Sequence, residues 1–466
     1  MSKKANMIVR VMKTNIFNPY LSACLLAIIS IVIFFPGFMS YDSFSQYGQA
    51  LGREPLTDFH PPGMSYLWRS MCLIVKSPGT LLIFDQFVYW GGIAIFAYAV
   101  AIRTWVQILL VLIIGFWPPL YIISLHLWAD VGMMSFLALT VACLAAHCKD
   151  KKKIWLFIAT GSLFVVMAFR YNGITGVLPL LAYTAWCFSG YSSARIQSTV
   201  KTFFALALAF ILGIRIISIG TQHVSALNVP MVWDLSAISV AENKDLFPDY
   251  LNKTPGPNFM GRVREHWNPN VVELFDVSPF VAREKEQDFH KYWATTVLHN
   301  FRPYMAHRMH VAWSLLGLTH SIHDPYHKAG IDKPNMFELD FANPEVVRHR
   351  MMPLFQKVSS WPVYRVWLYF LLAFIIIFQY LRKQRLSFVS GRFGPLPAIT
   401  ALSGVMVELP LFIAAPSTEF RYSIWMVFSV LLAVVMLVSE RISLQGLPLK
   451  PLFVSPKNGE NTSHNM

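Results

Sequence analysis

Ten long apolar segments constrain the fold of this chain more than any other feature of its sequence. Most approach the roughly 20 residues that an α-helix needs to cross the hydrocarbon core of a bilayer. The chain is 55% hydrophobic and only 14% charged, whereas about a quarter of the residues in a soluble protein are charged. We therefore expect an all-α multi-spanning membrane protein with about ten transmembrane helices and an outer-face loop region of mixed structure. The expected spans are 18–38, 80–101, 104–123, 131–148, 154–169, 173–189, 202–220, 362–381, 395–415 and 421–438.

The basic residues predict which side of the membrane each connection faces. Short cytoplasmic connections are enriched in Lys and Arg, and a cytoplasmic N-terminus places most basic runs of this chain on that side. The net charge of +14 then reflects contact with membrane lipids, and we expect no nucleic-acid partner. The first apolar segment lacks a small-residue cleavage site, so we expect a retained helix. The basic runs are Lys3 and Lys4, Lys149 to Lys153, Arg195 and Lys201, and Arg382 to Arg385.

The same pattern divides the chain into four parts. An N-terminal transmembrane module occupies 1–220, and its first outer loop, 39–79, carries the candidate active site. A large outer loop, 221–361, is long enough to form a small folded unit. The C-terminal transmembrane helices occupy 362–440, and the polar tail 441–466 is expected to be cytoplasmic and disordered.

Side chains that can do chemistry gather in the turns that this topology places outside. The first outer loop provides two acids and a histidine, and three further turns each provide an acid or a fixed cation. If the helices form one bundle, the four turns can converge on a single site. The candidate catalytic residues are Asp42, Asp58, His60 and Asp130, and the candidate substrate-binding residues are Gln46, Arg170, Tyr171, Asn172, Glu419, Arg421 and Tyr422.

Most of these candidates also have a purely structural interpretation. Aspartate is a frequent helix cap, which applies to Asp42, to Asp130 and to Asp58 ahead of a helix starting at Pro61 or Pro62. The arginines Arg170 and Arg421 could extend toward lipid headgroups. Arginine in an outer turn runs against the usual charge bias, however, which favours a functional role.

Two further features suggest other chemistry. Glu408 lies inside an apolar span, where an acid is costly and faces a cavity or a partner; Arg215 is a candidate partner in an ion pair. The second feature is the run 320–327, which contains three histidines and an aspartate that could ligate zinc, but Pro325 interrupts a shared helical face. His60, by contrast, could simply be a solvated loop residue, since it precedes two prolines. We expect no metal and no cofactor.

Four short motifs resemble those of the multi-spanning GT-C glycosyltransferases, which take a sugar from a polyprenyl-phosphate carrier on the outer face of the membrane. Among them the chain looks most like O-antigen-modifying glucosyltransferases and related bacterial membrane proteins, and the resemblance in topology covers nearly the whole chain. Ala129 stands where some relatives have a lysine, and Ser43 stands where some have a second acid. The motifs are Pro-Gly-x-x-x-x-Asp-Ser-x-x-Gln at 36–46, Asp-x-His-Pro-Pro at 58–62, Arg-Tyr-Asn-Gly at 170–173 and Glu-x-Arg-Tyr at 419–422.

The resemblance implies a function and a role for several residues. It implies an inner-membrane glycosyltransferase that moves a sugar from a polyprenyl-phosphate donor to a glycan or lipid-linked acceptor, such as O-antigen, with inversion. Asp42 would be the general base, Arg421 and Arg170 would bind the phosphate, and His60 or Asp58 would orient the acceptor or Asp42. Partner proteins would make and flip the donor.

Two alternatives to a transferase remain. A transporter or flippase of lipid-linked sugars places polar groups near the middle of the membrane and often contains repeated, broken helices; only Glu408 and Arg215 favour it. A non-catalytic membrane assembly protein would not need Asp42.

Overall fold

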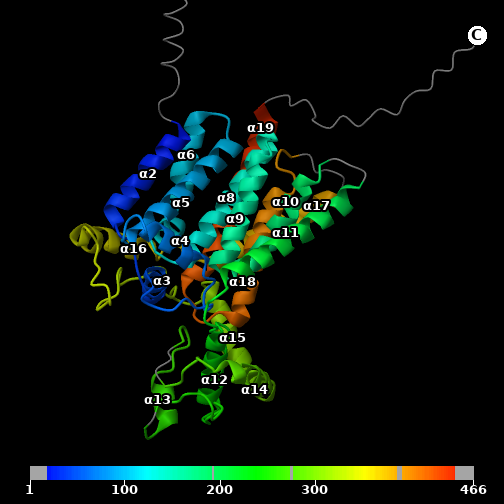
Figure 1. Ribbon diagram of the computed structural model, residues 1–466. Coiled ribbons are helices and arrows are strands. Elements are labelled where there is room, and N and C mark those ends of the chain that lie inside the picture. The colour runs from blue at the N-terminus through cyan, green and yellow to red at the C-terminus, as the bar shows by residue number, and fades with distance from the viewer. Residues whose placement is uncertain (1–17, 191–193, 255, 273–275, 386–390, 447–466) are drawn as a thin grey trace, which may run out of the picture.

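The protein is a helical bundle with a smaller helical lobe at one end (Figure 1). The computed structural model describes residues 18–190, 194–254, 256–272, 276–385 and 391–446. These residues contain helices and isolated β-bridges but no β-strand. The expectation of an all-α protein is therefore confirmed.

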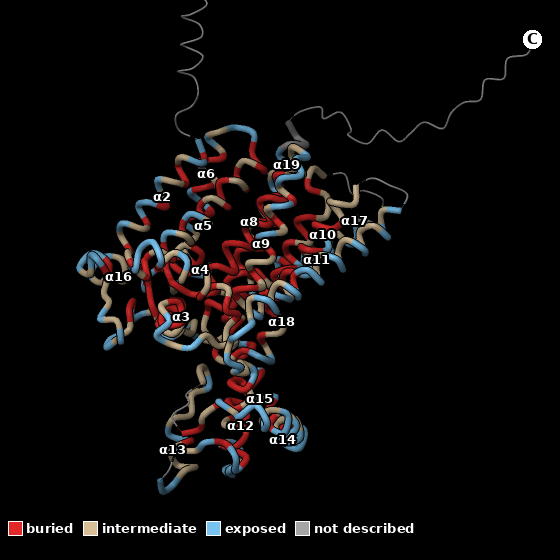
Figure 2. Tube along the Cα trace, viewed as in Figure 1, coloured by how far each residue is buried: buried red, intermediate tan, exposed pale blue. Residues whose placement is uncertain are grey.

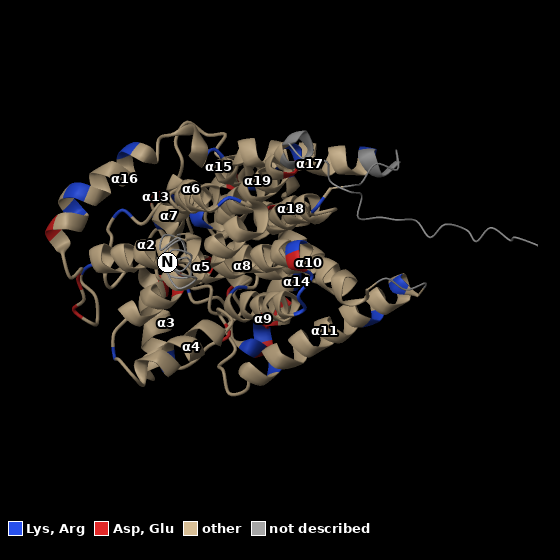
Figure 3. Cartoon of the chain, turned by 90° about the horizontal axis from the view of Figure 1, so that it is seen from above, with Lys and Arg blue, Asp and Glu red and all other residues tan. Residues whose placement is uncertain are grey.

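The apolar segments all form helices, although not all are long enough to be clear membrane spans. Among the described residues, five helices are long and apolar enough to cross a membrane, and the pair α6 and α7, bent by 72°, is a sixth candidate. Four predicted spans are shorter apolar helices. Charged residues are sparse along the bundle (Figure 3). The bundle consists of α2 (Pro19–Phe34), α5 (Gly79–Val100), α6 (Thr104–Gly115), α7 (Pro118–Ser124), α8 (Ala129–Asp150), α9 (Ile154–Phe169), α10 (Gly173–Phe188), α11 (Arg195–Ile217), α17 (Val366–Arg385), α18 (Leu396–Ala414) and α19 (Ile424–Gly446).

Helix α8 forms the centre of the bundle. It packs against α5, α9 and α19. Of the residues in its apolar stretch, 83% are buried, whereas only 6% are buried in the apolar stretch of α11 at the margin of the bundle. Figure 2 shows the same contrast between the red interior and the pale blue α11. Because Asp130 lies in the first turn of α8, the fold places this acid at the end of the most buried helix.

The first connection after α2 is tied to two distant parts of the chain. Helix α2 ends at Phe34, ahead of Pro36, which has no backbone N–H and restricts the residue before it. Phe38 then exchanges backbone hydrogen bonds with the chain around His126, and Met39 does the same with the chain around Ile331. These contacts fix the start of α3 (Tyr41–Leu51) beside the start of α8; α4 (Gly63–Cys72) follows.

The lobe is built from residues 228–315 and projects from the end of the bundle at which α8 begins (Figure 1). A buried ion pair holds it together: Arg308 Nε lies 2.7 Å from Asp234 Oδ1. Burial raises the pKa of Asp234 to about 6, and Arg308 opposes that shift. The lobe helices are α12 (Asn228–Glu242), α13 (Phe259–Glu265), α14 (Glu286–His299) and α15 (Phe301–Leu315), and α16 (Met352–Val358) follows them.

Several predicted boundaries need correction: the expected span 202–220 corresponds to α11, which begins at Arg195, and the expected span 362–381 corresponds to α17, which begins at Val366. The first span was expected to reach residue 38, but its helix ends at Phe34. The tail was expected to begin at 441, but α19 continues to Gly446. The rest of the tail, 447–466, and the basic residues before 18 lie outside the described residues.

Candidate functional site

Asp42 lies in the first turn of α3, at the end of the bundle that carries the lobe. Ser40 precedes the helix, and its hydroxyl accepts a hydrogen bond from Trp128 Nε1 at 2.8 Å. Asp42 is therefore not the N-cap that the sequence allowed. A carboxylate in the first turn of a helix is favoured by the positive end of the helix dipole, and the side chain is 27% exposed, so it can be reached from solvent.

Asp130 and Arg170 form a buried ion pair beside Asp42. Arg170 Nε donates to Asp130 Oδ1 at 3.0 Å, and the Asp130 side chain is 0% exposed. Trp128 is the residue at the N-cap of α8, so the interpretation of Asp130 as a cap is wrong. Arg170, at the end of α9, likewise points into the protein and not to lipid headgroups. Each charge needs the other, because an unpaired buried charge costs several kcal/mol.

His60 connects this pair to Asp42. Gly63 begins α4 against the end of α9, where a Cβ atom would lie only 2.5 Å from the Ala168 carbonyl oxygen; this close approach brings the loop carrying His60 to Arg170. Arg170 Nη1 lies 3.3 Å from His60 Nδ1, and His60 Nε2 lies 4.0 Å from Asp42 Oδ1. His60 is therefore held among charged groups and is not a solvated loop residue.

The geometry also assigns the state of His60. Burial, and then the charge of Arg170, lower the pKa of His60 to about 4, so the ring is neutral at pH 7. A guanidinium can only donate hydrogen bonds, so Nδ1 accepts and Nε2 carries the proton. This N–H faces Asp42. His60 can thus donate to Asp42 or to a ligand between them, but it cannot act as a base through Nε2 in this tautomer.

Arg421 joins three carboxylates. Its Nη1 atom lies 2.8 Å from Asp42 Oδ2 and 4.0 Å from Asp130 Oδ2, and its Nε atom lies 2.6 Å from Glu419 Oε2. The guanidinium stacks over the Trp128 ring, 4.5 Å from its centroid, and its side chain is buried. The interpretation of Arg421 as a residue extending to lipid is wrong.

These contacts set the protonation of Asp42. Burial alone would raise the pKa of Asp42, but the positive charges of Arg421 and Arg170 hold that pKa well below its usual range. Asp42 is thus an ionised carboxylate at any physiological pH. We call the six residues that share these contacts the Asp42 cluster: Asp42, His60, Asp130, Arg170, Glu419 and Arg421.

The lobe holds the turn that carries Glu419 and Arg421. Thr418 N donates to the Asn270 carbonyl at 2.7 Å, and Arg308 Nη1 donates to the Ala415 carbonyl at 2.9 Å. The same Arg308 pairs with Asp234 in the lobe core. The lobe therefore acts as a support that fixes the position of Arg421 relative to α3.

The other candidates surround the cluster or lie apart from it. Tyr422 lies between the two arginines, with its ring centroid 5.5 Å from Arg170 Cζ and 5.2 Å from Arg421 Cζ. Gln46 is buried one turn after Asp42, and its Nε2 atom has no hydrogen-bond partner among the described residues; the same holds for Asn172 Oδ1. In the described part of the chain, these two atoms form no side-chain hydrogen bond with the cluster.

Asp58 does not join the cluster. Its carboxylate faces the lobe, where it contacts His223 Nδ1 at 2.7 Å, and its backbone carbonyl accepts from the Tyr171 hydroxyl at 2.8 Å. It is also not the cap of α4, which begins at Gly63. The structure thus gives Asp58 and Tyr171 contacts that join loops, and it does not bring their side chains into the Asp42 cluster.

The two features that suggested other chemistry have ordinary surroundings. Glu408 is buried in α18 and accepts from the Ser423 hydroxyl at 2.9 Å, while Arg215 is exposed on α11 and forms no ion pair with it in the described part of the chain. The histidines at 320–327 do not gather, and the described residues contain no group of three ligands placed to hold a metal ion.

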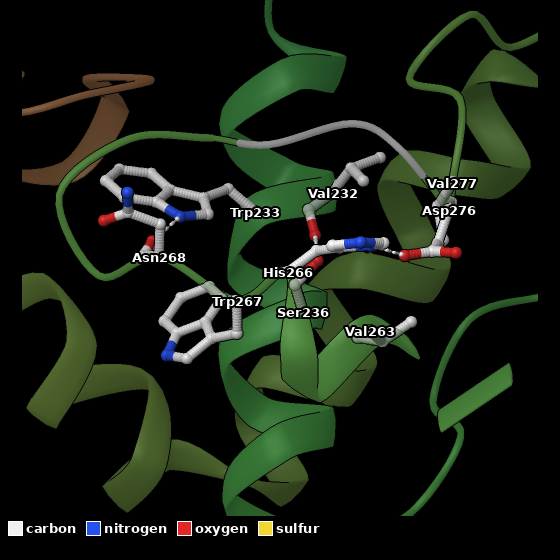
Figure 4. A pocket seen from close by; sticks show the side chains of 9 residues that line it. All are labelled: Val232, Trp233, Ser236, Val263, His266, Trp267, Asn268, Asp276 and Val277. Atoms are coloured by element: carbon white, nitrogen blue, oxygen red, sulfur yellow. Dashed lines mark hydrogen bonds and ion pairs between the residues drawn. The ribbon is translucent and has the colours of Figure 1, made fainter. Parts of the chain in front are cut away.

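A small cavity in the lobe lies apart from the cluster (Figure 4). Its volume is about 20 Å³, which is room for about one water molecule. His266 Nδ1 and Asp276 Oδ2 form a 2.6 Å pair at its wall. A sugar ring cannot enter a space of this size, so we attribute the cavity to the packing of the lobe.

Two residues in these contacts were missed by the sequence analysis. Trp128 packs on Arg421, and the signal for it was an aromatic residue two positions before an acid in an outer turn. His223 bridges Asp58 and Glu286, and only its position just after α11 could have indicated a role.

Comparison with known proteins adds no constraint: no family model, no curated protein and no solved structure matches this chain.

Proposed function

We propose that the protein is a membrane glycosyltransferase that moves a sugar from a polyprenyl-phosphate carrier to a cell-surface glycan, such as O-antigen, on the outer face of the bacterial inner membrane. The observation that carries the proposal is the Arg421–Asp42 pair at one end of an apolar bundle. It sets a carboxylate next to a cation suited to phosphate, at the end of the bundle that the proposed topology turns to the outer membrane surface. Arg170 provides a second cation in the same cluster.

The proposed reaction is a single displacement. The acceptor hydroxyl gives its proton to the Asp42 carboxylate, and its oxygen forms a bond to the anomeric carbon. The bond from that carbon to the phosphate oxygen breaks, and the electron pair leaves with the lipid phosphate. Attack from the side opposite the leaving group inverts the anomeric centre. Arg421 and Arg170 stabilise the charge that develops on the departing phosphate.

His60 has a positioning role in this scheme. Its Nε2–H faces Asp42 and can orient the acceptor hydroxyl or the carboxylate. Arg170 fixes the tautomer by donating to Nδ1. The cluster provides three carboxylates for this scheme, those of Asp42, Asp130 and Glu419, of which Asp130 is fully buried.

The proposed topology has ten spans, with the cluster outside and both termini in the cytoplasm. Contacts at the opposite end of the bundle support it: Lys149 donates to the Tyr98 carbonyl, and Arg392 donates to the Ala99 carbonyl. These basic residues meet at the end away from the cluster, as a cytoplasmic face requires. In a cysteine-free background, a membrane-impermeant thiol reagent added to intact cells should label Tyr171→Cys and not Lys152→Cys. The reverse pattern would overturn the orientation.

The transfer itself can be tested with purified protein in liposomes. Radiolabelled polyprenyl-phosphate sugars are supplied with a lipopolysaccharide acceptor, and label on lipid and on glycan is followed separately. Movement of label from lipid to glycan supports the proposal. Label that crosses the bilayer while it stays on the lipid would favour a flippase, the alternative to which the buried Glu408 in α18 points.

A further inference from the structure

The Asp42 cluster contains more negative than positive charge. Asp42, Asp130 and Glu419 are carboxylates, whereas Arg170 and Arg421 are its two cations. The sixth member is a neutral histidine, because burial and Arg170 lower its pKa to about 4. The cluster therefore has one negative charge in excess. A phosphate that enters meets arginines whose charge is already compensated, so one carboxylate must give way.

Only one of the three carboxylates is placed to leave. Asp130 is 0% exposed and hydrogen-bonded to Arg170. Asp42 lies in the first turn of α3, where the helix holds it between Arg421 and His60. Glu419, in contrast, lies outside any helix, just before the short 3₁₀ turn Phe420–Ser423 that leads into α19. Its other carboxylate oxygen accepts a hydrogen bond from the Ser417 hydroxyl at 3.1 Å. Glu419 can keep this hydrogen bond when its carboxylate moves away from Arg421.

Glu419 also occupies the part of Arg421 that suits a phosphate. The Nε edge of a guanidinium binds phosphate with two parallel hydrogen bonds. Arg421 Nε lies 2.6 Å from Glu419 Oε2, and Nη2 donates a long hydrogen bond, 3.5 Å, to the Tyr422 hydroxyl. Nη1 is already used by Asp42.

We infer that the Glu419 carboxylate occupies the position of the donor phosphate in the empty site. It pairs with the Nε edge of Arg421, and the phosphate of the lipid carrier displaces it on binding. This inference rests on the proposed function. The exchange sets donor affinity, since the protein binds the phosphate only to the extent that it outcompetes Glu419. It also keeps Arg421 in position between turnovers, because the buried cation always has an anion at that edge.

The test is a binding experiment that needs no transfer. Farnesyl phosphate is titrated into the full-length protein in detergent, and its dissociation constant is measured by calorimetry for the parent and for Glu419→Gln. Loss of the competing carboxylate charge at the Nε edge of Arg421 should tighten binding about tenfold. Glu345→Gln is the matched control, because Glu345 is 88% exposed and pairs with His349 one turn away; this variant should bind like the parent.

Further ligands and a second variant separate the outcomes. Inorganic phosphate that binds as tightly as farnesyl phosphate would assign the site to free phosphate, and farnesol should not bind. Glu419→Asp keeps the charge on a shorter side chain and serves if Glu419→Gln does not fold. It should bind more tightly than the parent and more weakly than the glutamine variant. Equal or weaker binding by both variants, with clear binding by the parent, overturns the inference and leaves the proposed function standing. No binding by any form overturns both.

Discussion

Arg421 forms a 2.8 Å ion pair with Asp42, although one residue lies near the start of the chain and the other near its end. The pair closes the bundle, because Asp42 belongs to the first helix after α2 and Arg421 to the turn before α19. It also sets the two groups that the proposed reaction needs, a base and a phosphate-binding cation, in direct contact.

Replacement of Arg421 by lysine tests the need for a planar, two-edged cation. Lysine keeps the charge but cannot contact Asp42, Glu419 and a phosphate together. We expect the KM for the lipid donor to rise by about tenfold or more, with a smaller fall in kcat. The control is Arg350→Lys, at an exposed position, which should leave both constants unchanged. A normal donor KM in Arg421→Lys would contradict the assignment of the phosphate site.

The Asp130–Arg170 pair is expected to be a stability element. Arg170→Met leaves Asp130 buried without its main partner, which should lower the free energy of unfolding by roughly 3 kcal/mol. Arg421, 4.0 Å from Asp130, will compensate in part. The double variant Arg170→Met, Asp130→Asn should recover much of the loss. Purely additive effects in unfolding experiments in detergent would show that the pair is not coupled.

The lowered pKa of His60 predicts that the protein loses stability in acid. Its pKa is about 4 in the folded protein, below its ordinary value of 6.5, so the unfolded chain binds more protons between these values. The stabilisation is present above pH 6.5 and is lost as the pH falls toward 4. The unfolding midpoint of the parent should therefore drop more steeply over this window than that of His60→Gln. Parallel curves would mean that His60 is not held neutral.

His223 predicts the opposite dependence. Hydrogen bonds that His223 donates to the carboxylates of Asp58 and then Glu286 raise the pKa of His223 above 6.5, so it holds the loop between α3 and α4 to α14 most strongly when protonated. This contribution is present below pH 6.5 and is lost as the pH rises through the raised pKa. Hydrogen exchange in residues 53–60 should become faster above that pH in the parent. In His223→Gln it should be fast throughout, whereas the exposed control His349→Gln should follow the parent.

Much of the site could be predicted from sequence, because charged side chains in an apolar chain are few. Topology alone placed Asp42, Asp130, Arg170 and Arg421 at one side, and the structure brings them together. Their pairing could not be predicted, since it depends on how α8, α9 and α19 pack. Asp58 shows the limit: it shares a short loop with His60, yet its side chain turns to the lobe.

The lobe was the least predictable part. Its helices carry no long apolar pattern, and its core depends on an ion pair between Asp234 and Arg308, which are far apart in sequence. Arg308 also donates to the Ala415 carbonyl and so supports the turn that carries Arg421. Neither the sequence around Arg308 nor that around Ala415 indicates this contact.

Sugar transfer by Asp42→Asn, compared with the parent at equal protein level, tests the central claim most directly. Asparagine keeps the shape of the side chain but cannot accept the proton of the acceptor. We predict that the rate of label transfer from polyprenyl phosphate to glycan falls by about 10²- to 10⁴-fold, while farnesyl phosphate still binds. The control is Asp249→Asn, at an exposed position in the lobe, which should transfer label at the parental rate. Transfer by Asp42→Asn at the parental rate would contradict the assignment of Asp42 as the base.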